Sequence, residues 1–391
     1  MNTYPKMFCS NIEKYYKNNV YIFLSSNIIA VNTLYSEAQK TTAELFIVLI
    51  LGIFFCSGYM TGSDWRNYEI CYEDATWNAL FNPSRYLEPG YYFYMLLAKS
   101  IGLSFWPFFI ITKFILYIIN VRYIYKYTKE YFPLALSFFL FVFGLYLFID
   151  NPMRNFIANT IYLYAFPLIF KRKFLSYCGL VLLATSFHYS SVILLVFYGM
   201  SHKISTKNIV FAYICVNVLF VFDASLFIDF LLKLGIFEQK LHFYFLMENE
   251  AGTGTTLSFR LIFFIIIFCF LIRYREYIEK RPYGVILFNG AILYLFIFRV
   301  ALSFGILFRY GFFFALHFSI AVFMFLPVLK TQMRVMYKFA IFLLISYSTF
   351  SIINSNKVYI PYTNYFMYLF NEKMPSYRER DSYNYRPNIY L

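Results

Sequence analysis

Twelve apolar stretches follow one another along this chain between residues 21 and 353, and they leave no room for a soluble domain of useful size. They lie at residues 21–35, 43–60, 90–103, 105–123, 132–149, 153–170, 174–200, 208–231, 257–272, 284–303, 306–329 and 336–353. A helix needs roughly 20 apolar residues to cross about 30 Å of hydrocarbon. The chain is also 61% hydrophobic and only 14% charged, whereas a soluble domain carries roughly a quarter charged residues. The sequence therefore predicts an all-α, polytopic membrane helix bundle.

The basic loops between these stretches mark the cytoplasmic side of the membrane. Five loops hold 15 Lys or Arg against three acids, at residues 122–130, 171–173, 203–207, 273–281 and 330–338. The long loop 61–88 instead holds five acids and two arginines, and it is expected outside. Most of the net charge of +14 lies in the basic loops. We therefore expect no nucleic-acid partner.

Strict alternation across the membrane does not fit all twelve stretches. To keep the basic loops on one side, residues 91–102 must form a short re-entrant or interfacial piece rather than a full span. The stretch 174–200 must break near His188 and return to the side of the membrane from which it started. The prediction is about ten full spans and two broken ones. The domains are then an N-terminal tail (1–20), a membrane domain (21–353) with an outer loop (61–89), and an extracytoplasmic tail (354–391). Alternation also places Lys6, Lys14 and Lys17 outside, against the charge rule.

Four arginines, Arg154, Arg260, Arg299 and Arg309, stand at the ends of stretches that face away from the cytoplasm. Arginine normally stays inside, and the neighbouring carboxylates are too few to neutralise all four. Guanidinium groups bind phosphate oxygens in pairs, so an anionic ligand on the outer face explains them. The alternative is that each arginine reaches the interface or pairs with one acid such as Asp150. Arg299 and Arg309, ten residues apart across a turn, favour a shared ligand.

His188, in the segment ATSFHYSS, lies in the middle of a long apolar stretch. It either makes a hydrogen bond within the bundle or relays a proton in a polar cavity. The outer segments GSDWRNYEICYEDATW and YLEPGYYFYM mix carboxylates with aromatic rings. Such a mixture suits a glycan, although a belt of interfacial aromatic residues has a similar composition.

Nothing in the sequence predicts a metal or a cofactor. The six cysteines are scattered without CxxC spacing, and no cluster of Asp or His is dense enough to hold Mg²⁺. We therefore expect no cofactor, no metal and no disulfide framework.

Six short motifs occur in a recognisable order: GSDWxxY, EPGYY, PMRNFIA, LLATSFHYSS, FRYGFFF followed by LPVL, and IPYTN. The ordered set resembles the EpsG-like family of Wzy-type polysaccharide polymerases over roughly residues 45–365. The resemblance implies a GT-C-like glycosyltransferase of the bacterial cytoplasmic membrane, with its active site facing the periplasm or the exterior. Such an enzyme joins oligosaccharide repeat units carried on undecaprenyl diphosphate into O-antigen, capsule or exopolysaccharide. The functional residues implied by matching positions are Asp64, Tyr68, Glu88, Arg154, His188, Arg309 and Tyr310.

The implied partners are lipid-linked repeat units and membrane lipid, with a chain-length regulator as a candidate. Arginines would stabilise the leaving diphosphate, and Asp64, Glu88 or His188 would take the acceptor's proton. Asp64 is the preferred base, since it lies where the acceptor glycan is expected to arrive. The chain departs from the family at Trp65, where relatives often have Tyr, and at residues 56–59, where many have an arginine. Whether Arg260 or Arg299 replaces that arginine stays open.

Three other classes share part of this pattern. A ligase that transfers finished glycan would use the same donor and similar arginines. A flippase or transporter would need a cavity open to both sides, whereas the charged residues here gather on one. A membrane O-acyltransferase would need access for acyl-CoA from the cytoplasm.

Overall fold

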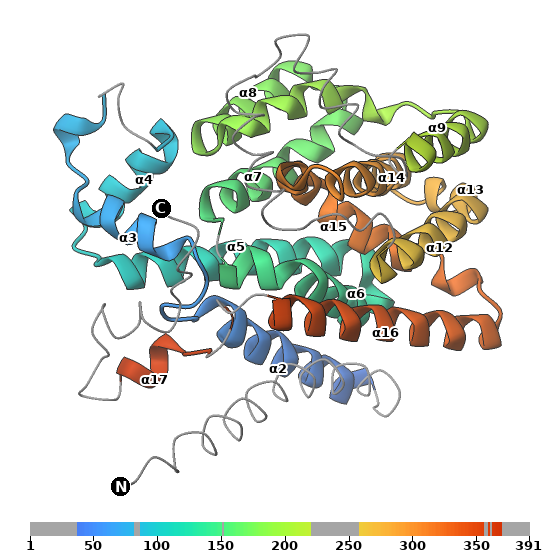
Figure 1. Cartoon of the computed structure of the whole chain (residues 1–391), viewed down its shortest axis with the longest axis horizontal. Coiled ribbons are helices and arrows are strands. Elements are labelled where there is room, and N and C mark those ends of the chain that lie inside the picture. Colours follow the sequence, from blue (N-terminus) through green and yellow to red (C-terminus); the bar gives the residue numbers. More distant parts are fainter. Residues whose placement is uncertain are drawn as a thin grey trace, which may run out of the picture. The chain divides into compact units, whose positions relative to one another are not determined.

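The computed structural model describes residues 37–81, 87–150, 152–219, 258–355, 359 and 362–369, and these residues fold almost entirely as helices (Figure 1). The described part contains no strand, and one isolated antiparallel bridge joins Gly58 and Asn364. The predicted all-α class is confirmed. Residues 1–35, Lys6, Lys14 and Lys17 among them, lie outside the described residues, as do 220–231 and most of the tail 354–391.

The helices are α2 (Glu37–Cys56), α3 (Trp65–Glu73), α4 (Pro89–Ser100), α5 (Phe105–Thr128), α6 (Phe132–Phe139), α7 (Met153–Phe170), α8 (Phe174–Phe187), α9 (Thr206–Leu219), α12 (Phe259–Arg273), α13 (Arg275–Glu279), α14 (Gly284–Ala301), α15 (Phe308–Met324), α16 (Thr331–Ser355) and α17 (Tyr365–Leu369). A π-helix, η3 (Leu140–Asp150), continues α6, and a 3₁₀-helix, η4 (Tyr189–Ser201), follows α8. Shorter 3₁₀ turns are η1 (Trp77–Ala79), η2 (Lys129–Tyr131), η5 (Gly305–Leu307) and η6 (Leu326–Val328).

The chain forms two compact units. Unit 1 is built from Met1–Tyr164, Gly179–Val192 and Lys330–Leu391, and unit 2 from Ala165–Cys178 and Ile193–Leu329.

The continuous helix of α6 and η3 forms the centre of unit 1, with α2, α5 and α16 packed around it (Figure 1). All eight side chains of α6 and most of those in η3 are buried. A helix that is apolar on every side has no face for water and is stable only when it is surrounded. This helix ends at Asp150, and α7 begins at Met153.

Helix α3 lies against α5 through one apolar face made of Trp65, Tyr68 and Tyr72. This spacing places the three rings on one side of a helix. Its last carbonyls, which a helix end leaves without partners, accept bonds from Lys99 of α4. The Nζ atom of Lys99 lies 3.1, 2.6 and 3.1 Å from the carbonyl oxygens of Tyr72, Glu73 and Ala75. Lysine also complements the negative end of the helix dipole, so α3 and α4 are joined at this end.

The described end of the IPYTN motif ties the C-terminal segment to the end of α2. The N–H of Tyr59 donates to the carbonyl of Thr363 at 2.8 Å, and the N–H of Tyr365 to that of Ser57 at 2.8 Å. The ring of Tyr362 stacks on Phe54 with centroids 4.7 Å apart. This motif therefore closes unit 1.

Unit 2 is built on a pair of adjacent helices, α14 and α15, with α9, α12 and α13 packed on α14 (Figure 1). Gly290 lets the pair approach closely, because a Cβ there would lie 2.9 Å from the Cβ of His317. Arg275 of α13 donates to Glu279 at 2.6 Å and to Thr206 of α9 at 2.8 Å.

Five helices in the described ranges are long and apolar enough to cross a membrane: Phe105–Thr128, Phe132–Asp150, Gly284–Ala301, Phe308–Val328 and Thr331–Asn354. Four further apolar helices are shorter, Glu44–Cys56, Phe174–Phe187, Tyr189–Ser201 and Thr206–Leu219. These helices indicate a membrane protein. The count of about ten full spans stays a prediction.

The helix break predicted near His188 is present. Helix α8 ends at Phe187, and η4 begins at Tyr189. The chain then runs back along α8, since Phe174 contacts Tyr198 with ring centroids 4.9 Å apart, and Tyr177 donates to the carbonyl of Leu194. Fourteen residues of α8 rise only about 21 Å, less than the roughly 30 Å of a hydrocarbon core. A short helical hairpin of this kind is what a re-entrant segment requires, with His188 at its tip.

Candidate functional site

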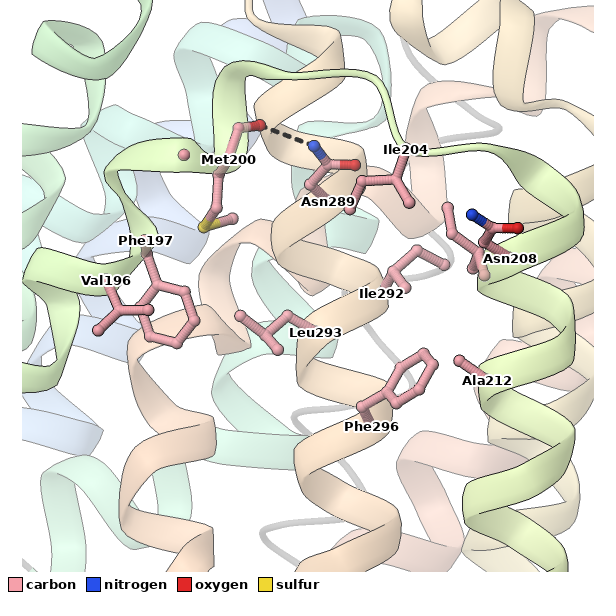
Figure 2. A pocket seen from close by; sticks show the side chains of 12 residues that line it. Val196, Phe197, Met200, Ile204, Asn208, Ala212, Asn289, Ile292, Leu293 and Phe296 are labelled. Carbon is pink, nitrogen blue, oxygen red and sulfur yellow. Dashed lines mark hydrogen bonds between the residues drawn. The ribbon is translucent and has the colours of Figure 1, made fainter.

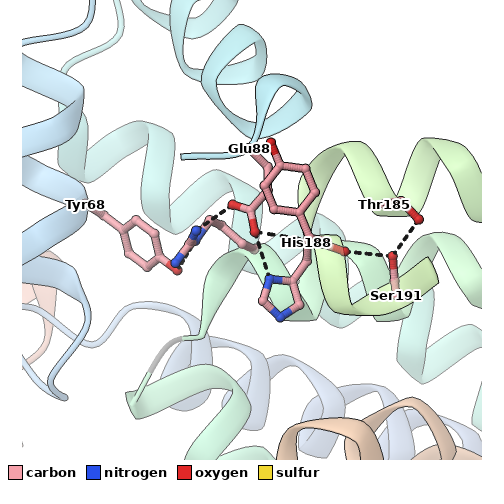
Figure 3. Close-up of polar contacts among 7 residues, drawn as sticks. Tyr68, Glu88, Thr185, His188 and Ser191 are labelled. Atoms are coloured by element: carbon pink, nitrogen blue, oxygen red, sulfur yellow. Dashed lines mark hydrogen bonds and ion pairs between the residues drawn. The ribbon is translucent and has the colours of Figure 1, made fainter. Parts of the chain in front are cut away.

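Four side chains that are widely separated in the sequence meet in unit 1: Tyr68, Glu88, Arg154 and His188. Figure 3 shows Tyr68, Glu88 and His188 among these contacts. One oxygen of Glu88 lies 2.5 Å from Nη1 of Arg154, and the other lies 3.1 Å from Nδ1 of His188. The Nε atom of Arg154 donates to the hydroxyl of Tyr68 at 3.4 Å. The structure thus brings together four of the predicted site residues around one carboxylate.

Glu88 sits immediately before α4, where local sequence holds it in place. Its backbone is extended, with φ −62° and ψ 145°, and Pro89 starts the helix. Proline restricts the preceding residue to such a conformation. Burial by itself raises the pKa of the Glu88 carboxyl, but the hydrogen bond from His188 and the charge of Arg154 outweigh it and lower the pKa below its usual value. Glu88 is therefore ionised at neutral pH.

A glycine brings the tip of the α8 hairpin to Glu88. A Cβ at Gly90 would lie 2.3 Å from the hydroxyl and 2.8 Å from the carbonyl oxygen of Ser186. No other residue permits this approach without a shift of α4 or α8. The glycine of the EPGYY motif and the serine of the SFHYSS motif therefore fit against each other.

His188 is fixed by its own turn. Its N–H bonds to the carbonyl of Ala184 at 2.9 Å, which ends α8, and its carbonyl accepts from both the N–H and the hydroxyl of Ser191 at 3.0 and 2.8 Å. The Ser191 hydroxyl also lies 3.3 Å from that of Thr185 (Figure 3). The residue is held by backbone on both sides of the break.

The contact with Glu88 sets the tautomer of His188. An ionised carboxylate only accepts hydrogen bonds, so Nδ1 carries a proton and donates it. In the neutral ring Nε2 is then an acceptor. Nε2 has no hydrogen-bond partner among the described residues, and Figure 3 shows it on the side of the ring turned away from Glu88. This arrangement leaves one ring nitrogen able to take a proton.

Exposure increases outward from the carboxylate. The Glu88 side chain is 5% exposed, that of His188 15% and that of Arg154 28%. Two of the five N–H donors of a guanidinium are used by Glu88 and Tyr68, which leaves three for a ligand. A solute reaching the cluster would meet the histidine and the arginine before the carboxylate.

The acid partner of Arg154 is Glu88 and not Asp150. Asp150 instead accepts from the N–H and the hydroxyl of Ser63 at 2.9 and 2.7 Å. Gly62 makes this contact possible, because its φ is +92° and a Cβ there would lie 2.0 Å from the carbonyl oxygen of Ile149. The GSD motif is therefore packed on the end of η3.

Asp64 holds a different position from Glu88. It precedes α3, and its carbonyl accepts from the N–H of Tyr68 at 3.3 Å, while its carboxylate lies 3.5 Å from the hydroxyl of Ser63. Its negative charge adds to burial in raising the pKa of Tyr68 to about 12. Asp64 thus lies close enough to Tyr68 for its charge to act on the phenol.

The remaining predicted residues lie in unit 2. Arg299 is buried in the last turn of α14, 1% exposed, and Nη2 lies 3.4 Å from the carbonyl of Asn217. Arg260 and Arg309 each occupy the second position of a helix, α12 and α15, and Arg309 is exposed while Tyr310 is half-buried. Arg299 and Arg309 flank the turn between α14 and α15. The shared ligand predicted for this pair stays a prediction.

Two contributors to the cluster, Gly90 and Ser186, were not predicted individually from the sequence, and their only sequence signal was membership of the EPGYY and SFHYSS motifs. Tyr189 and Ser191 follow His188 at the break, where the sequence indicated a polar cavity. The N–H of Tyr189 lies 3.4 Å from Glu88, and Ser191 bonds to the carbonyl of His188. Within the described ranges no three His, Cys, Asp or Glu side chains gather as a metal site needs. The metal-independent reaction stays a prediction.

These features define a helical membrane protein that carries a buried glutamate joined to a histidine and an arginine. The sequence profile of the EpsG family matches residues 44–367, which is most of the chain. The chain therefore belongs to the EpsG family, whose members are Wzy-like polymerases, and the family expected from the motifs is confirmed. Comparison with curated proteins and with solved structures gives no match.

Proposed function

We propose that this protein is a Wzy-type polysaccharide polymerase of the bacterial cytoplasmic membrane. It joins oligosaccharide repeat units carried on undecaprenyl diphosphate, at the outer face of the membrane. The observation that carries the proposal is the Glu88–His188–Arg154 cluster in a chain of a family of Wzy-like polymerases. A proton acceptor and a phosphate-binding cation side by side are what this transfer needs.

The reaction is a substitution at the anomeric carbon of the growing chain. A hydroxyl oxygen of the incoming repeat unit forms the new bond to that carbon. The bond from the carbon to the diphosphate oxygen breaks, and the lipid diphosphate leaves with the electron pair. One proton is lost from the attacking hydroxyl, and negative charge builds on the departing diphosphate.

We assign His188 as the general base that accepts the proton of the attacking hydroxyl. Its Nε2 atom has a free lone pair once Nδ1 donates to Glu88, and a base must have its accepting atom open to the substrate. Glu88 is a poorer base, because its charge is already shared by Arg154 and His188 and its pKa is lowered. Glu88 then orients the imidazole and stabilises the imidazolium that forms, as the carboxylate of a catalytic triad does. We propose His188 as the base in place of Asp64, the base preferred from the sequence.

We assign Arg154 as the residue that binds the diphosphate of the donor. Its three remaining N–H donors can grip phosphate oxygens in pairs, and a fixed cation at the point where charge develops lowers the barrier. Tyr68 and Glu88 hold the guanidinium in one orientation, which avoids reorganisation during the reaction. Arg260, Arg299, Arg309 and Tyr310 stay proposed substrate-binding residues, as the sequence led us to expect. Asp64 is proposed to bind the acceptor glycan.

The test is a gel of glycan extracted from cells that lack this protein. We expect the long chains to disappear while single repeat units persist, because only polymerisation is lost. Loss of the single repeats as well would contradict the proposal and indicate a flippase or an earlier transferase. Long polymers retained on the carrier lipid would indicate a ligase instead.

A further inference from the structure

A second feature belongs to unit 2. An open cavity of about 450 Å³ lies within unit 2 between η4, α9 and α14 (Figure 2). Ligand pockets commonly hold roughly 300–1,000 Å³. The α14 wall is the stripe Asn289, Ile292, Leu293 and Phe296, which one face of a helix presents. From Asn289 to Phe296 this wall extends about 10 Å along the helix axis.

The two ends of the cavity differ in polarity. Figure 2 shows Asn289 and Asn208 at one end and Phe296 at the other. The lining between them is apolar and includes Val196, Phe197 and Ala212. The cavity therefore suits a ligand with a polar head and an extended apolar body.

Asn289 presents an acceptor to this cavity. Its Nδ2 donates to the carbonyl oxygens of Met200 and His202 at 2.7 and 2.9 Å, which fixes the orientation of the amide. Its Oδ1 is buried and has no hydrogen-bond partner in the part of the chain that the structure describes. Buried polar atoms are nearly always paired. A ligand that fills the cavity should therefore bring a hydrogen-bond donor to Oδ1.

Positive charge gathers on the segment beside the polar end. Lys203 and Arg275 share one carboxylate, that of Glu279, at 3.2 and 2.6 Å. Two cations on one anion leave an excess of positive charge. Lys207, directly before the lining residue Asn208, is exposed and adds to it. An anionic head group is complementary to this corner.

We propose that the cavity binds an anionic phospholipid whose head group carries hydroxyl groups, with phosphatidylglycerol as the simplest case. One acyl chain lies along Ile292, Leu293 and Phe296, a hydroxyl donates to Asn289 Oδ1, and the phosphate faces Lys203 and Lys207. The basic loop 203–207 is expected on the cytoplasmic side. The anionic lipids of the cytoplasmic leaflet attract clusters of Lys and Arg at that surface. The inference is independent of the proposed polymerase activity.

The experiment uses the full-length protein, purified in detergent and stripped of lipid. Dioctanoyl phosphatidylglycerol and dioctanoyl phosphatidylcholine are titrated separately, with native mass spectrometry to count bound lipid and thermal melting to measure stabilisation. We expect one phosphatidylglycerol to bind and raise the melting temperature, and phosphatidylcholine to do neither. Equal effects of the two lipids would overturn the proposal, since ordinary solvation of the apolar surface needs no anionic head.

Two matched pairs of variants localise the binding. Ala212→Trp fills the cavity, whereas Phe211→Trp introduces the same indole ring at the neighbouring position, which is 71% exposed. Lys207→Gln removes a charge at the polar end, whereas Lys280→Gln removes one from the exposed end of α13. We expect Ala212→Trp to abolish lipid binding and Lys207→Gln to weaken it about tenfold. The two control variants, Phe211→Trp and Lys280→Gln, should bind the lipid nearly as well as wild type. Unchanged binding in Ala212→Trp would show that the lipid does not occupy this cavity.

Discussion

The carboxylate of Glu88 and the imidazole of His188 are 100 residues apart in the sequence, and 3.1 Å separates Oε1 from Nδ1 in the structure. Each residue lies at the edge of a short helix rather than within a long span. A helix that stops part of the way leaves unpaired backbone, which a membrane protein tolerates only where that backbone is buried or lines a cavity. The short helices α4 and α8 therefore place the reactive groups where polar groups are tolerated.

The first prediction concerns the fit of α4 against α8. Gly90→Ala places a methyl group against the backbone of Ser186 and should move His188 away from Glu88. A displacement of about 1 Å can lower a reaction rate 10²-fold. We therefore expect the rate of polymerisation to fall by about that factor, while the amount of the variant protein in the membrane stays normal. Gly179→Ala in α8 is the control, since a Cβ there meets nothing within 4 Å. Similar activity of the two variants would contradict the role of this contact.

The second prediction is a pH dependence of stability. The pKa of the Glu88 carboxyl is lower in the folded protein than in the unfolded chain. Its ionisation therefore stabilises the folded state fully at pH values above the pKa of the unfolded chain. This stabilisation is lost as the pH falls through the lower pKa of the folded state. Glu88→Gln should therefore be less stable than wild type by about 1–3 kcal/mol at pH 7. The difference should shrink in acid, below the ordinary carboxyl pKa of 4.5.

Thermal melting from pH 7 down to pH 3.5 checks this prediction. Glu73→Gln, an exposed position of α3, should show no such trend. A difference between wild type and Glu88→Gln that stays constant with pH would mean that the charge of Glu88 contributes nothing to stability.

The amino-acid sequence predicted much of the architecture because membrane insertion depends on local composition. The apolar stretches, the break near His188 and the helical class follow from patterns within one segment. The motifs also identified Tyr68, Glu88, Arg154 and His188, which the structure brings together.

Contacts between segments could not be predicted in the same way. Asp150 is four residues from Arg154 in the sequence, yet it bonds to Ser63, and Arg154 bonds to Glu88. Which acid pairs with Arg154 depends on how α3, α4 and α7 pack, and no periodicity encodes that. The fit of Gly90 on Ser186 is likewise visible only in three dimensions.

The third prediction separates charge from geometry at Arg154. Arg154→Lys keeps a cation near Glu88 but loses the planar fork that also reaches Tyr68. We expect kcat to fall about 10²-fold, as on removal of one donor that stabilises developing charge. The assay is elongation of lipid-linked repeats, with Arg122→Lys in the basic loop 122–130 as the control. An activity equal to that of Arg122→Lys would show that charge alone suffices.

The fourth prediction concerns Arg309, which is exposed in the first turn of α15. If it binds the donor diphosphate, Arg309→Lys and Arg309→Ala should both lose chain elongation while membrane abundance stays normal. Arg281→Lys, whose guanidinium bonds to Tyr277 in α13, should leave elongation unchanged. Gels of extracted polysaccharide measure the chain length. Full-length chains from both Arg309 variants would remove this residue from the site.

The most direct test of the proposed mechanism is polymerisation in vitro, with purified undecaprenyl-diphosphate-linked repeat units varied up to saturating concentration so that kcat and KM are both measured. Wild type is compared with His188→Gln, Glu88→Gln and Asp64→Asn, and with His202→Gln as an exposed histidine control. A general base contributes typically 10²- to 10⁴-fold, so kcat should fall by that factor in His188→Gln. Asp64→Asn should mainly raise KM, as a residue that binds the acceptor would. Normal turnover by His188→Gln together with an inactive Asp64→Asn would contradict the account and make Asp64 the base.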